Sequence, residues 1–434
     1  MPNRVSLDQD FPSISASEAL WKRAATLIPA GTQTLAKGPS QYVDGVAPKY
    51  LARGKGARVW DVDGNEFIDL TMAVGPVALG YGHPSVDRAI VEQLARGITF
   101  SLMHPLEVEV AELVRRVVPG ADSVRFSKTG CDVTSAAVRL ARAYTGRDKV
   151  LCCGYHGWHD WYIGSSPRSA GVPAATRALT EVFPYNDLFS LLEALDESVA
   201  CVILEPMIFE PPDTDYLRVL KRACEAAGAL LIFDEMWTGF RVALGGAQQR
   251  FDVTADLACF SKAVANGMPL SVLTGRADVM RLLEEDVFFF TTFGGEALSL
   301  AAAKATIEDL RELEVAARLE VVGQRLQRGY NELAAKKGLL TKASGLPCRT
   351  LVSFDPSAGD PLLQKSLVQQ ELIRHGVLWT GFHNLCLAHD DAEIDHVLAA
   401  YDRALDTLSA ALAHGKLAEK LRGKPVRPVF RKTL

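Results

Sequence analysis

The sequence has few of the features that mark secreted, membrane or metal-stabilised proteins. It has no run approaching the 18 apolar residues that a membrane-spanning helix needs, and its first residues lack the apolar core of a secretory signal. Its eight cysteines are scattered, without C-x-x-C pairs, which argues against disulfides and structural zinc. A net charge of −5 gives no reason to expect nucleic acid or a membrane as partner. We therefore expect a cytoplasmic protein.

The order of strands and helices predicts an α/β protein. At 434 residues, with 48% hydrophobic and 23% charged residues, the chain can form two or more domains. Strands alternate with helices from about residue 123 to 275, which is typical of a parallel sheet covered by helices on both faces. From Glu312 onward, long charged helices alternate with short strands, which predicts an α+β carboxy-terminal domain. The strands we expect are 123–127, 150–153, 199–204, 230–233, 257–260 and 270–275, then 350–354, 377–380 and 385–388.

Two charged residues follow two of these apolar strands. Asp234 comes directly after residues 230–233, and Lys262 comes two residues after 257–260. Ligands bind at the carboxyl ends of such strands, so we expect both side chains at the same edge of the sheet. A lysine there can lose its charge and become a nucleophilic amine, and a carboxylate can hold a pyridinium nitrogen protonated. Together they suit pyridoxal 5′-phosphate (PLP): a Schiff-base lysine and a partner for the ring nitrogen.

Two glycine-containing turns are candidate phosphate sites. Residues 128–132 lie between a strand and the amino terminus of a long helix, where unsatisfied N–H groups favour an anion. Many such turns bind nothing, so the turn alone is a weak signal. The turn at residues 291–295 is either a second phosphate site or an ordinary helix start.

Residues 154–162 form a third candidate segment, an aromatic loop after a strand that suits stacking on a flat ring. A metal site built from His156, His159 and Asp160 is the alternative, and the glycines disfavour it because they indicate a loop rather than a helix. A calcium site at Asp61, Asp63 and Glu66 lacks the EF-hand spacing, and a hairpin explains that segment better. We expect no metal.

At several separate motifs the chain resembles the class III aminotransferases, which are fold-type I PLP enzymes, and most closely the glutamate-1-semialdehyde 2,1-aminomutase branch. The motifs are DEMWTGFR at 234–241, FSK at 260–262, ARAYTGR at 141–147 and TFGG at 292–295. The resemblance implies a large domain with a mostly parallel seven-stranded sheet flanked by helices, and a smaller α+β domain from both terminal segments. We place the large domain at 71–315, the amino-terminal segment at 1–70 and the small domain at 316–434.

The resemblance also implies a role for each matching residue. Lys262 carries the cofactor as a Schiff base and transfers the substrate proton, while Asp234 pairs with the ring nitrogen. Tyr155 stacks on one face of the ring and Met236 packs on the other. The remaining cofactor contacts implied are Thr129, Gly130 and Cys131 at the phosphate, His156 and Glu205 in the pocket, and Thr292 at the phosphate of a second subunit. The last of these implies a homodimer.

The chain departs from the family pattern where the family binds substrate. The aminomutase arginine for the substrate carboxylate is Lys37 here, a point charge without the bidentate fork of arginine. The asparagines that open the family's Asn-Ser-Gly-Thr turn and follow its Gly-Gly turn are Lys128 and Glu296. We expect Lys37, Trp158 and Glu296 to face the substrate.

These observations favour an aminotransferase that moves an amino group from glutamate or a related amine to a ketone or aldehyde, through a pyridoxamine intermediate. The alternative is an intramolecular aminomutase of the glutamate-1-semialdehyde type, which the absence of the arginine at Lys37 disfavours. A PLP-binding regulator is disfavoured by the presence of Lys262 and Asp234, and a metal hydrolase by the spacing of the histidines.

Overall fold

A computed structural model describes residues 7 and 10–427, so the beginning of the chain, where we expect no secretory signal, lies outside the described residues. The chain divides into two compact units. The large unit is Pro84–Ala316, and the small unit combines the described parts of Met1–His83 and Ala317–Leu434. Among the described residues, no helix has the length and apolar character needed to cross a membrane.

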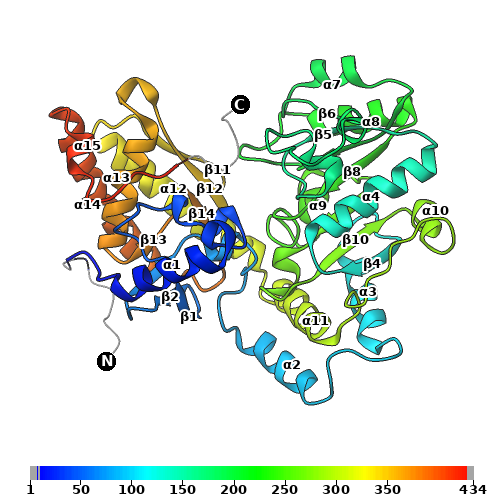
Figure 1. Cartoon of the computed structure of the whole chain (residues 1–434), viewed down its shortest axis with the longest axis horizontal. Coiled ribbons are helices and arrows are strands. Elements are labelled where there is room, and N and C mark those ends of the chain that lie inside the picture. The colour runs from blue at the N-terminus through cyan, green and yellow to red at the C-terminus, as the bar shows by residue number, and fades with distance from the viewer. Residues whose placement is uncertain (1–6, 8–9, 428–434) are drawn as a thin grey trace. The chain divides into compact units, whose positions relative to one another are not determined.

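The large unit is built on one seven-stranded sheet with the strand order β4-β10-β9-β8-β7-β5-β6 (Figure 1). Its strands are β4 (Ser123–Ser127), β5 (Lys149–Cys153), β6 (Thr180–Val182), β7 (Val199–Leu204), β8 (Leu230–Asp234), β9 (Leu257–Phe260) and β10 (Ser271–Gly275). The helices around them are α2 (Pro84–Leu94), α3 (Pro105–Val117), α4 (Gly130–Thr145), α5 (Asp160–Ile163), α6 (Ala174–Arg177), α7 (Leu188–Ala194), α8 (Tyr216–Ala227), α9 (Gly246–Phe251), α10 (Ala277–Met280) and α11 (Ala297–Glu312), with short 3-10 turns η5 (Lys262–Ala265) and η6 (Arg281–Leu283).

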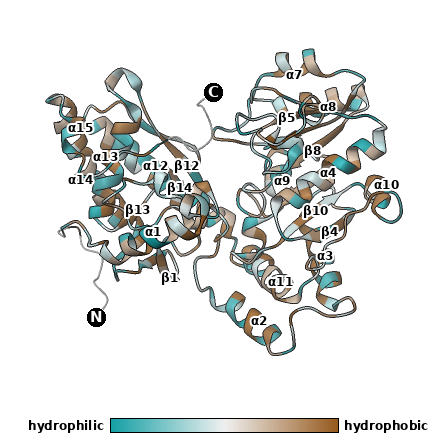
Figure 2. Ribbon diagram, in the orientation of Figure 1, coloured by the Kyte–Doolittle hydropathy of each residue, from teal (hydrophilic) through white to brown (hydrophobic). Residues whose placement is uncertain are grey.

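The central strands of this sheet are buried on both faces, as their uninterrupted apolar runs predict. All residues of β7, β8, β9 and β10 are buried. Figure 2 colours each residue of the chain by its hydropathy. Strands β5, β6, β7, β8 and β9 pair in parallel, whereas β10 is antiparallel to both of its neighbours. The expected mostly parallel seven-stranded sheet is therefore confirmed. Strand β6 is not among the strands that the sequence predicts, because its three residues are too few to form a pattern.

Helix α4 follows the candidate phosphate turn and packs against the sheet. It crosses β7, β8, β9 and β10 and buries a face of small and branched side chains against them. Thr129 stands at its amino-terminal cap, and Gly146 ends it with a φ of 69°, a left-handed conformation that glycine adopts at little cost. This cap lies two residues after Ser127, the carboxyl end of β4.

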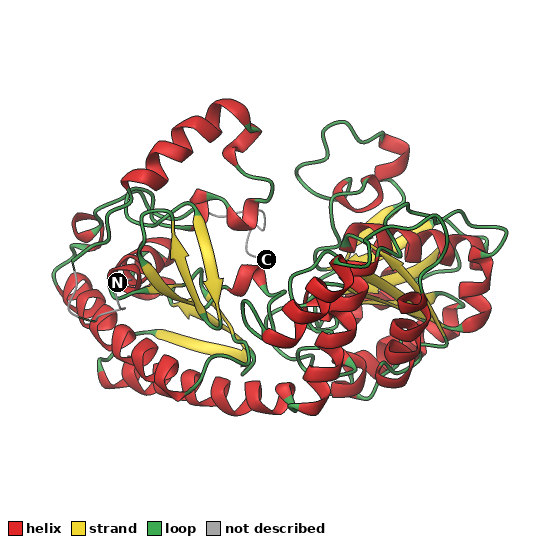
Figure 3. Ribbon diagram, turned by 90° about the horizontal axis from the view of Figure 1, so that it is seen from below, coloured by secondary structure: helices red, strands yellow, loops and turns green. Residues whose placement is uncertain are grey.

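The small unit contains a four-stranded sheet, β1-β2-β3-β13, and a three-stranded sheet, β11-β12-β14. Its strands are β1 (Leu51–Lys55), β2 (Arg58–Asp61), β3 (Glu66–Asp69), β11 (Thr341–Leu346), β12 (Arg349–Phe354), β13 (Val377–Leu378) and β14 (Phe382–Asn384). Its α-helices are α1 (Ser15–Leu27), α12 (Val315–Lys336, which begins at the boundary), α13 (Pro361–Arg374), α14 (Asp391–Ala413) and α15 (Leu417–Lys420). Its 3-10 turns are η1 (Pro29–Gly31), η2 (Leu35–Lys37), η3 (Pro39–Gln41), η4 (Met72–Val74) and η7 (Pro356–Ala358). Figure 3 distinguishes the helices and strands of each unit by colour.

One sequence-based expectation about the small unit is wrong. The strand expected at residues 385–388 is absent: β14 ends at Asn384, and the apolar residues after it lie in irregular backbone. A short apolar run does not reveal whether a neighbouring strand is present to pair with it. The first segment of the compact unit reaches His83, where the backbones of Gly56 and Tyr81 exchange hydrogen bonds of 2.7 and 2.8 Å.

Candidate active site

The site begins at the carboxyl ends of β8 and β9. The two strands are parallel and in register, with Asp234, the last residue of β8, opposite Cys259. Lys262 follows three residues after Cys259 and opens the 3-10 turn η5 with a φ of 50°. Such a left-handed conformation costs a non-glycine residue about 1 kcal/mol or more and is concentrated at functional sites. Asp234 and Lys262 therefore occupy neighbouring strand ends, as expected.

Asp234 is a deeply buried carboxylate with few partners. Its side chain is 1% exposed; Oδ2 lies 2.8 Å from Nδ1 of His156, and Oδ1 accepts a 3.1 Å hydrogen bond from the Met236 N–H. Burial raises the pKa of Asp234, and His156 opposes that rise through its hydrogen bond and charge. A second cation at this carboxylate would favour its ionised form further.

The other nitrogen of His156 fixes the orientation of the ring. Nε2 lies 3.1 Å from the carbonyl oxygen of Cys153, which only accepts hydrogen bonds, so Nε2 carries a proton. The hydrogen bond between Nδ1 and Asp234 then contains one further proton, which is bound either to His156 or to Asp234. In both cases the two side chains together carry no net charge, which is how a carboxylate can be kept in a buried site.

The loop after β5 places an aromatic ring beside these groups. The N–H of Tyr155 donates a 2.8 Å hydrogen bond to Oε1 of Glu205, while the Tyr155 side chain remains 45% exposed. Burial raises the pKa of Tyr155, and Cys131 and Asp234 add to the rise. Gly154 precedes the loop with a φ of 107°, and a Cβ there would lie 2.7 Å from Glu205 Oε1. Only glycine allows this approach.

The amino terminus of α4 meets the loop after β8. A Cβ on Gly130 would lie 2.7 Å from Sδ of Met236, and a Cβ on Gly157 would lie 2.5 Å from Sγ of Cys131. The glycines thus allow the turn, the aromatic loop and the Asp234 loop to converge. Burial would raise the pKa of Asp132, but hydrogen bonds from the Thr129 N–H and the Ser127 hydroxyl, both 2.8 Å, lower it overall.

The expected residues of the large unit fall into two groups. One group surrounds the ends of β4, β5, β7 and β8: Thr129, Gly130, Cys131, Tyr155, His156, Glu205, Asp234 and Met236, with Lys262 at the neighbouring end of β9. The other is the exposed turn at residues 291–295, which carries Thr292 and lies against β4, since a Cβ on Gly294 would lie 2.9 Å from the carbonyl oxygen of Phe126.

The three expected substrate residues lie in different surroundings. Trp158 is 67% exposed within the aromatic loop. Glu296 is the amino-terminal cap of α11 and binds Lys128. Lys37 belongs to the small unit, where it lines a cavity of about 280 Å³ together with Tyr42, Asp69 and other residues of that unit.

Sequence reasoning gives no role to Glu235, although it follows Asp234 directly. Its side chain is fully buried and accepts hydrogen bonds from the N–H groups of Ala247 (2.7 Å) and Gln248 (3.0 Å) and from the Thr238 hydroxyl. The Glu235 side chain therefore caps the amino terminus of α9. Burial raises the pKa of Glu235 to about 7. A glutamate directly after the end of a buried strand is the available signal, but two of its partners, Ala247 and Gln248, lie too far away in the sequence to be identified.

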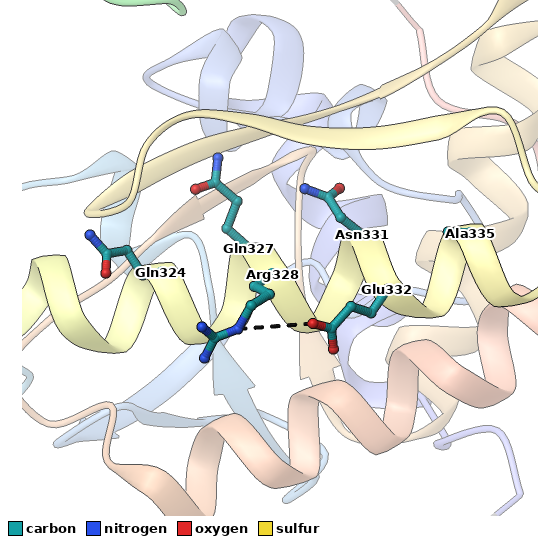
Figure 4. Close-up of a pocket in the computed structure, with 6 residues that line it drawn as sticks. All are labelled: Gln324, Gln327, Arg328, Asn331, Glu332 and Ala335. Atoms are coloured by element: carbon teal, nitrogen blue, oxygen red, sulfur yellow. Dashed lines mark ion pairs between the residues drawn. The ribbon is translucent and has the colours of Figure 1, made fainter.

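In the described part of the chain, neither a metal site nor a ligand site in the groove along α12 finds support. No group of three or more His, Cys, Asp or Glu side chains is placed to hold a metal, and His159 Nδ1 lies 2.7 Å from the Ser135 hydroxyl. A groove of about 600 Å³ follows α12 in the small unit (Figure 4). There Gln327 and Asn331 bind the backbone of β11, and Arg328 pairs with Glu332 at 4.0 Å, so these side chains serve the helix and the hairpin.

Comparison with known proteins identifies the family. Residues 42–388 match the family described as aminotransferase class-III. The chain is 33% identical over 405 residues to 3-aminobutyryl-CoA aminotransferase of Cloacimonas acidaminovorans, covering 90% of this chain and 97% of that protein. It is 36% identical over 433 residues to glutamate-1-semialdehyde 2,1-aminomutase of Roseiflexus castenholzii, covering 92% and 99%.

The fold agrees with this assignment. The FumI protein of Sphingopyxis sp. MTA144, whose structure was determined in its PLP internal aldimine form, has a TM-score of 0.85 and 30% identity, covering 92% of this chain and 97% of that one. An omega-transaminase from Sphaerobacter thermophilus has a TM-score of 0.83 and 26% identity, covering 91% and 98%. The expected fold and family are confirmed: this chain belongs to the class III aminotransferases.

Proposed function

We propose that this protein is a PLP-dependent aminotransferase that moves an amino group from a small amine donor to a ketone or aldehyde. The observation that carries the proposal is the arrangement of Asp234 and Lys262 at neighbouring ends of parallel strands. Their surroundings fit PLP. Asp234 is buried beside His156, and the glycine at position 130 allows the α4 terminus to pack closely on Met236.

Each residue then has a defined task. PLP supplies an electron sink that stabilises negative charge at the substrate carbon. Asp234 keeps the ring nitrogen protonated, and His156 holds that carboxylate in place. The α4 terminus at Thr129, Gly130 and Cys131 receives the phosphate, where N–H groups and the helix dipole favour an anion.

The remaining residues hold the ring and move the proton. Tyr155, with its backbone fixed by Glu205, would stack on the ring, and Met236 would pack against it. The amine of Lys262 would hold the cofactor and would move the proton at the substrate carbon. Proton transfer by a positioned amine is general acid–base catalysis, which contributes about 10²- to 10⁴-fold.

A homodimer completes the proposal. Two segments of the single chain expose large apolar side chains: Ile98, Phe100, Leu102 and Met103 before α3, and Phe293 in the turn of Thr292. A 2.9 Å hydrogen bond from the Ala297 N–H to the Ile98 carbonyl brings the two segments together. Exposed apolar surface of this kind marks an interface. A second copy covering it places Thr292 at the partner's phosphate; a cytoplasmic location stays a prediction.

The second candidate is the intramolecular aminomutase reaction, because glutamate-1-semialdehyde aminomutases are among the relatives. The lysine at position 37 speaks for the first proposal, since a point charge selects a carboxylate less strongly than arginine does. Its position in the wall of a cavity of the small unit agrees with a role in binding a small molecule.

Visible absorption spectra of the purified protein test the proposal. A band of lysine-bound PLP should convert to the pyridoxamine form with one amine from a panel that begins with L-glutamate, and return with a keto acid. A band that no amine converts, while a pyridoxamine-loaded sample responds to a semialdehyde, would support the aminomutase. Protein that takes up no PLP would refute both.

A further inference from the structure

The half-buried ion pair of Lys128 and Glu296 joins two segments that the proposed function assigns to phosphate binding. Lys128 directly precedes Thr129, the amino-terminal cap of α4, and its Nζ lies 2.8 Å from Oε1 of Glu296. Glu296 ends the turn that carries Thr292 and caps α11. We propose that this pair holds the Thr292 turn at a fixed position relative to the α4 turn and thereby sets how tightly the dimer retains PLP.

Glu296 is bound on both of its oxygens. Oε2 accepts a 2.9 Å hydrogen bond from the Leu298 N–H, and Oε1 accepts one of 3.0 Å from the Ser299 N–H, together with the Ser299 hydroxyl and Lys128. The carboxylate is thus held firmly by its own helix, and of these partners Lys128 is the one that comes from another element. A change at Lys128 therefore loosens the connection without removing the cap.

The side chains of the pair are largely withdrawn from water, with 19% of Lys128 and 10% of Glu296 exposed. Burial lowers the pKa of Lys128, and Glu296 offsets only part of that effect. Burial would raise the pKa of Glu296, but Lys128 and Ser299 lower it overall. The two charges are therefore less screened by solvent than those of an exposed surface pair, and removing one of them leaves the other partly buried without its partner.

The Thr292 turn approaches the rest of the large unit closely at its two glycines. A Cβ on Gly294 would lie 2.9 Å from the Phe126 carbonyl, and a Cβ on Gly295 would lie 2.6 Å from the Glu107 carboxylate. Thr292 itself is exposed. The resemblance described above has neutral asparagines at positions 128 and 296, so the charged pair is a departure of this chain from that pattern.

The proposal rests on the proposed function, and its test separates the two. Variants Lys128→Met and Glu296→Gln each remove one charge, and the double variant Lys128→Asn with Glu296→Asn supplies two neutral amides while keeping a good helix cap at 296. The matched control is Lys304→Met, which breaks an exposed 2.7 Å ion pair between the same helix α11 and Glu109 of α3.

Two readouts are needed. The first is amide hydrogen exchange of residues 291–296 in the PLP-free protein, and the second is the rate at which the PLP-loaded protein releases PLP to a scavenger. We expect each single variant to raise both about tenfold, since a charge-assisted hydrogen bond is lost. The double asparagine variant should recover to within about threefold of the wild type, and Lys304→Met should change neither.

Wild-type exchange and release in both single variants would overturn the proposal, as would a double asparagine variant that recovers no better than the single variants. Equal effects from Lys304→Met would overturn it too, because any ion pair of α11 would then serve. The exchange experiment needs no cofactor. If the wild type bound no PLP, the proposed function would fail while the anchoring of the turn was still decided.

Discussion

Replacing His156 with leucine tests how the buried Asp234 is kept ionised. The substitution removes the 2.8 Å contact between His156 Nδ1 and Asp234 Oδ2 and leaves the carboxylate with the Met236 N–H. Burial then raises the pKa of Asp234 without the opposing charge of His156. Less of the carboxylate is ionised at neutral pH, and the ring nitrogen of PLP loses its partner.

The size of the effect follows from the interaction that is lost. A hydrogen bond to a charged group contributes about 1.5–3 kcal/mol. At about 1.36 kcal/mol for each factor of ten, kcat/KM should fall roughly 10- to 150-fold. The direction of the pH effect follows as well. Activity needs ionised Asp234 and is lost as pH falls through the pKa of Asp234. A raised pKa therefore moves the acid side of the rate profile to higher pH.

The assay is kcat/KM with the best amino donor between about pH 5 and 9, the range in which a shifted carboxylate titrates, together with the dissociation constant of PLP. His156→Asn is the matched control, because the amide nitrogen of asparagine takes the place of Nδ1 and still donates to Asp234. It should recover part of the rate and shift the profile less. A His156→Leu protein with the wild-type rate and pH profile would refute the role given to the pair.

Three further changes test other parts of the account. Because burial raises the pKa of Glu235 from 4.5 to about 7, its contribution to the free energy of unfolding is greatest below pH 4.5 and is lost as pH rises through 7. The difference between wild type and Glu235→Gln in chemical denaturation should fall by about 3 kcal/mol over that range, and a constant difference would contradict this. Gly130→Ala should raise the PLP dissociation constant about tenfold by pushing Met236 aside, and adding Met236→Ala should raise it no further because that side chain is already displaced; a further rise would place the cause elsewhere. Met103→Asp puts a charge on a side chain that is 81% exposed, so it should leave unfolding unchanged but give monomers in sedimentation velocity at micromolar concentration; unchanged dimers would place the interface on another surface.

The catalytic edge of the sheet is predictable from the sequence because it depends on local patterns. Strands β7, β8 and β9 are continuous apolar runs, and parallel strands bring their carboxyl ends together, so the pattern alone places Asp234 and Lys262 at one edge. The reversed direction of β10 cannot be predicted in the same way, because a buried strand has the same composition in either direction.

Contacts between distant residues cannot be predicted from such local patterns. Lys128 and Glu296 stand out in the sequence as departures from a family pattern, but their 2.8 Å pair joins positions 168 residues apart. The sequence suggests that Glu296 faces the substrate, which stays a prediction, and it gives no sign that Glu296 caps α11. Likewise, the partners that fix Glu235 come from α9, after an irregular loop. Side chains that act through long-range hydrogen bonds need the fold before their partners can be named.

The most direct test of the central claim is to reduce the PLP-loaded protein with borohydride, digest it and locate the attached pyridoxyl group by mass spectrometry. The arrangement of β8 and β9 predicts a single labelled peptide that contains Lys262, and no label in the Lys262→Ala variant. Label on another lysine, or a wild-type protein that retains no label, would contradict the assignment of the site.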